Sequence, residues 1–406
     1  MAKRYQGGIL GAGFNPLQAP NAPTGVTAAG GDGDASVSFT APTNVGGSAI
    51  TGYTVQSNPG GVAATGSASP ISVSGLSNGT AYTFNVWALN SYGPSPAGGP
   101  SGSVTPQAAR GLFAFGANSS YAAVNTIDYV TIASTGNSTG FGQLTVARYD
   151  LSSCSSATRG IWGGGDTGSR SAIIDYVTIA SPGNATNFGN LTSATTQLAA
   201  CSSSTIGVFC GGYSTALADR TNVMTYITIA STGNSTSFGN LTAATNQLSA
   251  CSSPTRGLIG GGSTQTAGFG VSTITYITIA SAGNSTAFGN LAAVSYALAS
   301  CSSSTRGLFA GGNNGSAYLN TIGYVTIAST GNSTSFGALT LGRQNLSACS
   351  SSTRGLFASG LPASQTVSSV IDYVTIASTG NAATFGNLTA TAFRGAACSS
   401  AHGGLG

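Results

Sequence analysis

The sequence predicts an all-β protein in which a β-sandwich is followed by a six-bladed β-propeller. Short runs rich in Val, Ile, Tyr and Phe alternate throughout with Gly, Asn, Ser and Thr, which is the composition of strands and turns. From Cys154 onward, a peptide of the form CSSxTRG returns at intervals of 47 to 50 residues. Residues 21–106 carry none of these repeats, so the chain is expected to hold two different domains.

The repeat unit contains four expected strands. The copy that begins at Arg306 reads RGLFAGG, a variable loop, IGYVTIAS, the turn TGN, STSFGALT, a second variable stretch and LSACSSST. A period of about 50 residues with four short strands is typical of a propeller blade. Six copies begin at Arg110, Arg159, Ile206, Arg256, Arg306 and Arg354.

The two ends of the repeat region predict closure. The first copy starts at a second strand, Gly111 to Gly116, whereas the last copy ends with an additional first strand, Gly395 to Ser400. Pairing these two segments would complete the sixth blade and cover two exposed edges. The alternative is an open β-solenoid, which would need capping ends. The domains are therefore expected at 21–106 and 107–406.

Six of the seven cysteines occupy one position of the repeat: Cys154, Cys201, Cys251, Cys301, Cys349 and Cys398. Equivalent positions in successive repeats are too far apart for disulfides, so we expect small, buried, reduced side chains. Cys210 replaces an Ala or Gly of the other copies. No His/Cys spacing suggests a metal, and no cofactor is expected.

The composition argues against an enzyme. Only 5% of the residues are charged, with one His and no Glu. We interpret His402 as a turn residue, and Asp128, Asp175 and Asp372 as structural because they share one repeat position. The scattered charge predicts no nucleic-acid binding, and no apolar run is long enough for membrane insertion. Five TRG arginines are expected to cap carbonyls or stack on a neighbouring blade, with an anion-binding ring as the alternative: Arg110, Arg159, Arg256, Arg306 and Arg354.

The stretches that differ between copies are expected on one face of the propeller. They join second to third strands and fourth strands to the next first strand, and both connections leave a blade on the same side. Aromatic and Arg side chains on loops of a rigid scaffold favour ligand recognition. The candidate ligand-binding residues are Tyr121, Arg148, Tyr149, Arg170, Tyr213, Arg220, Phe269, Tyr296, Tyr318 and Arg394.

Particular residues carry resemblances to known families. Gly311 and Gly312 followed by Tyr324 resemble the kelch repeat, with Phe in place of its outer Trp. Leu76, Tyr82 and the stretch YTFNVWALNSYGPS resemble a fibronectin type III domain, with Phe39 where that family carries a core Trp. IDYVTIASTGN followed by CSSxTRG is similar to repeats in structural proteins of tailed bacteriophages, notably those of marine cyanobacteria.

These resemblances imply a non-enzymatic virion protein such as a tail fibre, appendage or decoration, assembled in the host cytoplasm. Residues 1–20 are expected to anchor it to other virion proteins, and the propeller to serve host attachment through surface polysaccharide or protein. Self-association into a homo-oligomer stays open. The alternative is a bacterial cell-surface or secreted adhesin built from the same modules.

Overall fold

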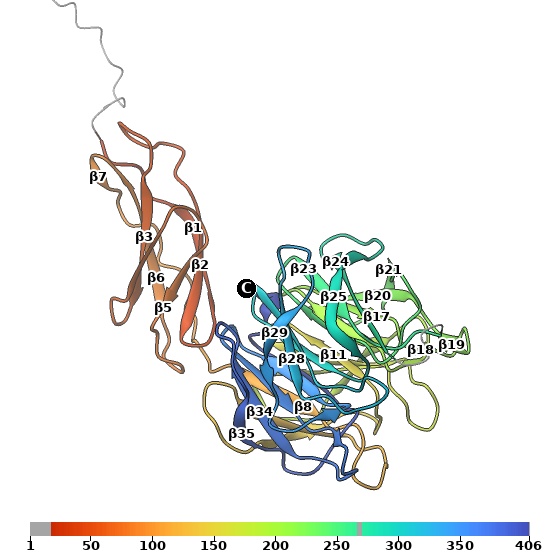
Figure 1. The fold of residues 1–406 in the computed structure, drawn as a ribbon. Coiled ribbons are helices and arrows are strands. Elements are labelled where there is room, and N and C mark those ends of the chain that lie inside the picture. The colour runs from red at the N-terminus through yellow and green to blue at the C-terminus, as the bar shows by residue number, and fades with distance from the viewer. Residues whose placement is uncertain (1–17, 266–269, 406) are drawn as a thin grey trace, which may run out of the picture. The chain divides into compact units, whose positions relative to one another are not determined.

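The computed structural model describes residues 18–265 and 270–405, and the chain divides into two units, Met1–Ala108 and Ala109–Gly406 (Figure 1). The helical content of the described residues is one 3-10 turn, η1 (Gly403–Leu405). None of the described segments is a helix long and apolar enough to cross a membrane. The prediction of an all-β protein is confirmed.

Within its described residues, 18–108, the first unit contains two antiparallel sheets, ordered β1-β2-β5 and β4-β3-β6-β7. Alternate residues of β2, β3, β5 and β6 are buried, as expected for strands with one face on a core. The strands are β1 (Thr24–Gly30), β2 (Asp34–Thr40), β3 (Gly52–Asn58), β4 (Ala63–Gly66), β5 (Ile71–Ser74), β6 (Thr83–Asn90) and β7 (Gly93–Pro94).

Two sequence expectations for this unit are met in its core. The hydroxyl of Tyr82 accepts a hydrogen bond from the backbone N–H of Ser77, 3.1 Å away, so the chain turns back over this ring as a tyrosine corner requires. Phe39 is buried with its ring centroid 4.7 Å from that of Tyr53. A smaller aromatic residue therefore fills the position where Trp was the family expectation.

The described residues of the second unit, 109–265 and 270–405, contain six four-stranded antiparallel sheets, one for each copy of the repeat. Sheet 1 is β36-β8-β9-β10, and sheets 2 to 6 each take four strands in chain order. Their bounds are β8 (Arg110–Ala114), β9 (Thr126–Thr131), β10 (Thr139–Gln143), β11 (Ser152–Ser155), β12 (Arg159–Gly163), β13 (Ile173–Thr178), β14 (Thr186–Asn190), β16 (Ala199–Ser202), β17 (Ile206–Cys210), β20 (Val223–Thr228), β21 (Thr236–Asn240), β22 (Ser249–Ser252), β23 (Arg256–Gly260), β24 (Val271–Thr278), β25 (Thr286–Ser295), β26 (Ala299–Ser302), β27 (Arg306–Ala310), β28 (Thr321–Thr326), β29 (Thr334–Ala338), β31 (Ser347–Ser350), β32 (Arg354–Ala358), β34 (Val370–Thr375), β35 (Ala383–Asn387) and β36 (Ala396–Ser399).

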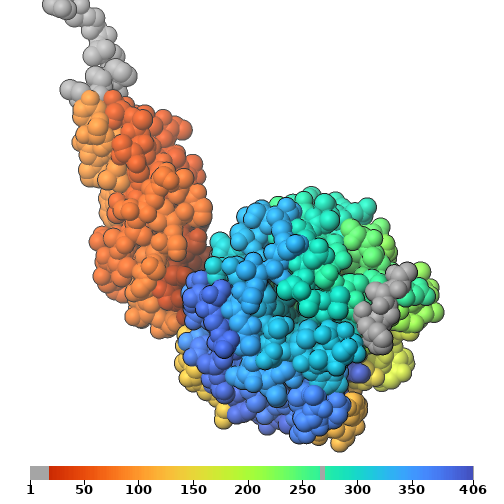
Figure 2. Space-filling view, viewed as in Figure 1, coloured from red at the N-terminus to blue at the C-terminus, as the bar shows by residue number. Residues whose placement is uncertain are grey.

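The last strand completes the first sheet. β36 pairs with β8, placing Ala397 opposite Phe113 and Cys398 opposite Leu112, as the offset between the two ends of the repeat predicts. The first strands contact one another in a circuit that runs β11, β16, β22, β26, β31, β36 and back to β11. In the space-filling view, the colours of residues 109–405 pass from yellow through green to blue around this unit (Figure 2).

Short additional strands connect the variable loops. β15 (Thr195–Thr196), β18 (Tyr213–Ser214) and β19 (Asp219–Arg220) form one small sheet. β30 (Arg343–Gln344) pairs with β33 (Leu361–Pro362). In both cases, a segment that precedes a first strand pairs with the loop between second and third strands. The two sets of variable loops therefore lie together at one end of the sheets.

A cysteine and a glycine fit together at every junction between sheets. All seven cysteines are buried and free, and each repeat cysteine lies against the Gly of the TRG peptide, or its equivalent, in the next sheet. A Cβ atom added to that Gly would lie 2.5 to 2.9 Å from the neighbouring Sγ atom. Atoms do not pack this closely, so any side chain at the glycine position would overlap the cysteine. The junction therefore needs the small side chain of Cys on one sheet and no side chain on the neighbouring sheet. The pairs are Cys154–Gly207, Cys201–Gly257, Cys251–Gly307, Cys301–Gly355, Cys349–Gly111 and Cys398–Gly160.

The TRG arginines join neighbouring sheets, as the structural interpretation expected. In Arg159, Nη1 donates to the carbonyl oxygens of Ile229 and Ala230, at 2.9 and 2.8 Å, and the guanidinium lies 4.8 Å from the ring centroid of Tyr176. Equivalent bonds and stacking recur at Arg110, Arg256, Arg306 and Arg354. In each of these arginines Nη1 donates to backbone carbonyl oxygens and the guanidinium lies over a tyrosine ring. These contacts favour the structural interpretation over the anion-binding ring.

Ile206 takes the place of the arginine in the third copy, which provides a test of this junction. We expect Ile206→Arg to raise the melting temperature by about 2 °C, because the new side chain would bond Ile279 and Ala280 and lie over Tyr226. Arg256→Ile is the reciprocal change, and we expect a decrease of similar size. Thermal unfolding followed by circular dichroism measures both, and an unchanged or lower melting temperature for Ile206→Arg would contradict the assigned role.

Candidate functional site at the mouth of the central channel

Six residues immediately before the first strands form a ring at the end of the sheets that carries the variable loops. Each backbone N–H donates to the carbonyl oxygen of the equivalent residue in the preceding copy, over distances of 2.7 to 3.0 Å. The bonds run from Asp150 to Arg394 and close without a gap. Together with the following leucines, these residues line a hollow of about 70 Å³. The ring consists of Asp150, Gln197, Gln247, Ala297, Asn345 and Arg394.

All six ring residues adopt the left-handed backbone conformation, with φ between 54° and 58°. Glycine adopts this conformation without strain, whereas other residues are disfavoured by about 1 kcal/mol or more, Asn least. The chain contains 61 glycines, yet none stands at these six positions. The backbone ring needs no side chain, because its bonds join peptide groups alone. Six side chains therefore surround the opening of the hollow, although the backbone ring does not need them.

One half of the ring is held by a chain of polar contacts. Asp150 Oδ2 lies 3.7 Å from Arg394 Nη1 and accepts a hydrogen bond from Gln197 Nε2 at 3.3 Å. Gln197 Oε1 accepts from Asn246 Nδ2 at 2.6 Å, and Asn246 Oδ1 accepts from Arg220 Nε at 2.9 Å. The charged and amide side chains of this half are therefore bound to other side chains of the protein.

Burial raises the pKa of Asp150 to about 6, even though Arg394 and the Gln197 hydrogen bond both lower it, while Asp166 adds to the increase. Because the folded protein favours the protonated carboxyl, it binds more protons than the unfolded chain between about pH 4 and 6. The protonated carboxyl of Asp150 therefore makes its full contribution to the free energy of unfolding below about pH 4, and this contribution is lost as the pH rises through about 6.

Asp150→Asn is expected to remove that dependence. Relative to the variant, the melting temperature of the natural protein should fall as the pH rises from about 4 to about 6 and then stay level. Thermal scans of both proteins at half-unit pH steps measure the difference, which also cancels the contributions of other titrating groups. A difference that does not change with pH would show that Asp150 keeps an ordinary pKa.

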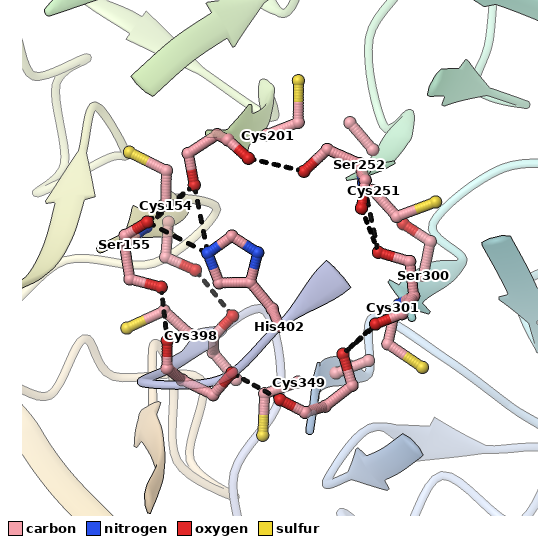
Figure 3. Close-up of a pocket in the computed structure, with 18 of the residues that line it drawn as sticks. Cys154, Ser155, Cys201, Cys251, Ser252, Ser300, Cys301, Cys349, Cys398 and His402 are labelled. Carbon is pink, nitrogen blue, oxygen red and sulfur yellow. Dashed lines mark hydrogen bonds between the residues drawn. The ribbon is translucent and has the colours of Figure 1, made fainter. Parts of the chain in front are cut away.

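A second ring of hydrogen bonds joins the serines at the other end of the first strands (Figure 3). The hydroxyl of each serine that follows a repeat cysteine donates to the carbonyl oxygen of its counterpart in the preceding copy, at 2.6 to 2.9 Å. The cysteine sulfur atoms point away from the centre in this view. The members are Ser155, Ser202, Ser252, Ser302, Ser350 and Ser399.

His402 lies inside this serine ring (Figure 3). Its Nδ1 accepts from the N–H of Gly404 at 3.0 Å, so its Nε2 carries the proton and donates to the carbonyl oxygen of Ser155, also at 3.0 Å. Burial lowers the pKa of His402, and the bond to Ser155 opposes this effect. The interpretation of His402 as a turn residue needs correction, because its imidazole is a hydrogen-bonded part of the channel interior.

The structure brings several predicted residues together beside the mouth. Tyr121, exposed at the loop surface, contacts the edge of Phe393, and Arg394 lies between the rings of Phe393 and Tyr149. On another side, Arg170 lies 4.3 Å from the ring centroid of Tyr213.

Further predicted residues lie along the same loops. Tyr213 pairs with Arg220 across two short strands. Tyr296 and Tyr318 both pair with Asn313 through isolated β-bridges, so they are neighbours. Burial first, and then Tyr318, raises the pKa of Tyr296. The hydroxyl of Tyr318 accepts from Gln365 Nε2 at 2.9 Å. Phe269 lies outside the described residues.

Arg148 is a correction to the predicted set. Its side chain is fully buried, with Nη1 3.0 Å from Asp175 Oδ2 and Nη2 donating to the carbonyl oxygen of Trp162 at 3.2 Å. Arg343 and Asp372 repeat this ion pair four copies later. Because Arg148 neutralises a buried carboxylate, it belongs to the core and cannot contact a ligand.

The sequence interpretation did not include five of the six ring residues: Asp150, Gln197, Gln247, Ala297 and Asn345. They are neither aromatic nor, with one exception, charged, and each immediately precedes a leucine that begins LSSCSS, LAACSS, LSACSS or LASCSS. The sequence does contain a signal that marks this position. The residue differs between most copies, whereas the next residue is leucine in five of the six copies.

Comparison with known families identifies the first unit. Residues 21–103 match the family model of the fibronectin type III domain, in agreement with the two sheets and the Tyr82 corner. Residues 21–103 form a fibronectin type III domain. Comparison of the whole chain with curated proteins gives no match.

Proposed function

We propose that residues 109–406 form a six-bladed, kelch-like β-propeller whose variable face recognises a molecule on a host surface. The circuit of contacts among the first strands and the pairing of β36 with β8 support this architecture. The recognition role depends on one observation above all: six ring positions with φ near 55° keep six side chains where glycine would relieve strain. The assignment is non-enzymatic and gives no residue a catalytic role.

The same proposal places the protein on a tailed-phage virion, as a fibre, appendage or decoration. The repeat stretch IDYVTIASTGN followed by CSSxTRG, which is similar to repeats in structural proteins of tailed bacteriophages, supports this location. In this arrangement, residues 1–20 attach the protein to other virion proteins, although residues 1–17 lie outside the described part of the chain. The fibronectin type III domain then acts as a spacer, and the propeller faces outward.

Three experiments test the location and the role separately. Mass spectrometry of purified particles should find the protein in the virion, and removal of residues 1–20 should abolish incorporation while both domains stay folded. If the protein is instead found on a bacterial cell surface and is absent from particles, the virion location is wrong and the protein is a bacterial adhesin. For the role, substitution of Tyr213, Arg220 and Tyr318 by Ala should reduce adsorption of particles to host cells. Unchanged adsorption would remove these loops from the recognition surface.

A further inference from the structure

We propose that the mouth binds a neutral saccharide through the side-chain amides of Gln247 and Asn345. Ala297, the third residue of this half of the ring, stands between them and offers the ligand no polar group. This inference rests on the proposed recognition function and assigns the chemical class of the ligand. The two halves of the ring differ. Asp150, Gln197 and Arg394 are engaged with one another or with Asn246, whereas in residues 18–265 and 270–405 the side-chain amides of Gln247 and Asn345 have no hydrogen-bond partner.

The arrangement of the three residues leaves a notch. Ala297 stands between Gln247 and Asn345 in the ring, since its N–H donates to Gln247 and its carbonyl accepts from Asn345. A methyl group thus separates two amides that have several atoms each. Gln247 and Asn345 also bear the strain of the left-handed conformation, which their side chains do not offset by any bond to the described residues.

The chemistry of this half favours hydroxyl groups. A carboxamide offers both donors and acceptors, and a sugar hydroxyl has the same dual capacity. No charged side chain belongs to this half, and the ionic groups of the ring, Asp150 and Arg394, are 3.7 Å apart and face one another. A charged ligand would therefore find no free counter-charge here, because binding it would require breaking that pair.

The floor of the hollow matches the other part of a sugar. Five leucines line it beneath the polar rim: Leu151, Leu198, Leu248, Leu298 and Leu346. A pyranose ring has hydroxyls around its edge and C–H groups on its faces, so its edge can bond the amides while a C–H surface or hydroxymethyl group lies against leucine. A hollow of about 70 Å³ admits such a group, and the remainder of the sugar would lie in the opening.

Two ring variants separate binding from stability. The double variant Gln247→Gly with Asn345→Gly removes both amides and relieves two strained positions, while Ala297→Gly relieves one strained position and removes only a methyl group. The double variant should melt about 2 to 4 °C above the natural protein, and Ala297→Gly about 1 to 2 °C above it. Titration of the full chain with methyl glycosides of glucose, galactose and mannose should give a dissociation constant of about 1 mM for at least one of them. The double variant should lose that affinity at least tenfold, and Ala297→Gly should retain it.

Three outcomes would overturn the saccharide assignment. These are binding of none of the three glycosides, equal binding by the double variant, or stronger binding of methyl glucuronide than of any neutral sugar. A fourth outcome would also overturn it. If the natural protein binds host cells but no longer binds them after the cells have been treated with protease, the receptor is a protein. In that last case the proposed recognition function stands, whereas absence of any cell binding would remove the function itself.

Discussion

Removal of residues 393–406 is expected to lower the melting temperature of the second unit by about 10 °C or more. The deletion takes away β36, which pairs with β8, and with it the fully buried Phe393 and the Cys398 that packs against Gly160. Each buried side chain of this kind contributes about 2 to 5 kcal/mol, and the loss would also expose the edge of β8.

A shorter deletion provides the matched control. Removal of residues 401–406 takes away His402 and η1 but leaves β36 (Ala396–Ser399) in place. We expect a much smaller decrease, because the deletion removes the packing of Ala401 and the contacts of His402 and two glycines near the serine ring, but no strand. Differential scanning calorimetry of both truncated proteins decides the matter. Equal melting temperatures for the two would contradict the role of β36 in closing the first sheet.

Gly337→Ala is expected to destabilise the protein by about 3 kcal/mol or more, whereas Gly380→Ala should have almost no effect. The two glycines lie on opposite sides of one contact. A Cβ atom on Gly337 would overlap the carbonyl group of Gly380 in the next sheet, while a Cβ atom on Gly380 would meet nothing within 4 Å. Backbone cannot move aside as a flexible side chain can, so the penalty falls on one variant alone.

Denaturant unfolding of these two variants measures the difference directly. Since the same contact recurs between Gly142 and Gly183 and between Gly386 and Gly136, Gly386→Ala and Gly136→Ala form an independent repetition across the two ends of the repeat. Similar stability for Gly386→Ala and Gly136→Ala would show that sheets 6 and 1 do not meet as described. Similar stability for Gly337→Ala and Gly380→Ala would contradict the general packing of neighbouring sheets.

The sequence predicts the strand content well because its signals are local. Alternating apolar residues and turn residues mark each strand, and the offset between the first and last copies predicts the pairing of β36 with β8. The Gly of TRG is conspicuous in the repeat, but its reason is a contact with a cysteine of the neighbouring sheet, which no single copy reveals.

The candidate site was harder to predict for a related reason. Arg148 has the residue type expected of a ligand contact, and only the spatial position of Asp175 shows that it is buried. Gln247 and Asn345 have ordinary residue types, and their distinction is a left-handed backbone that alternation and composition do not encode. The mouth becomes visible only when six distant positions close into one ring of hydrogen bonds.

Binding of the labelled full-length protein to host cells tests the central claim that the mouth is a recognition surface. The measurement compares the Gln247→Gly, Asn345→Gly double variant with Ala297→Gly, since both retain the backbone ring and both gain stability. Recognition at the mouth predicts cell binding at least tenfold weaker for the double variant than for Ala297→Gly, which should bind like the natural protein. Equal cell binding by all three proteins would show that the side chains of the ring recognise nothing, and would contradict the account.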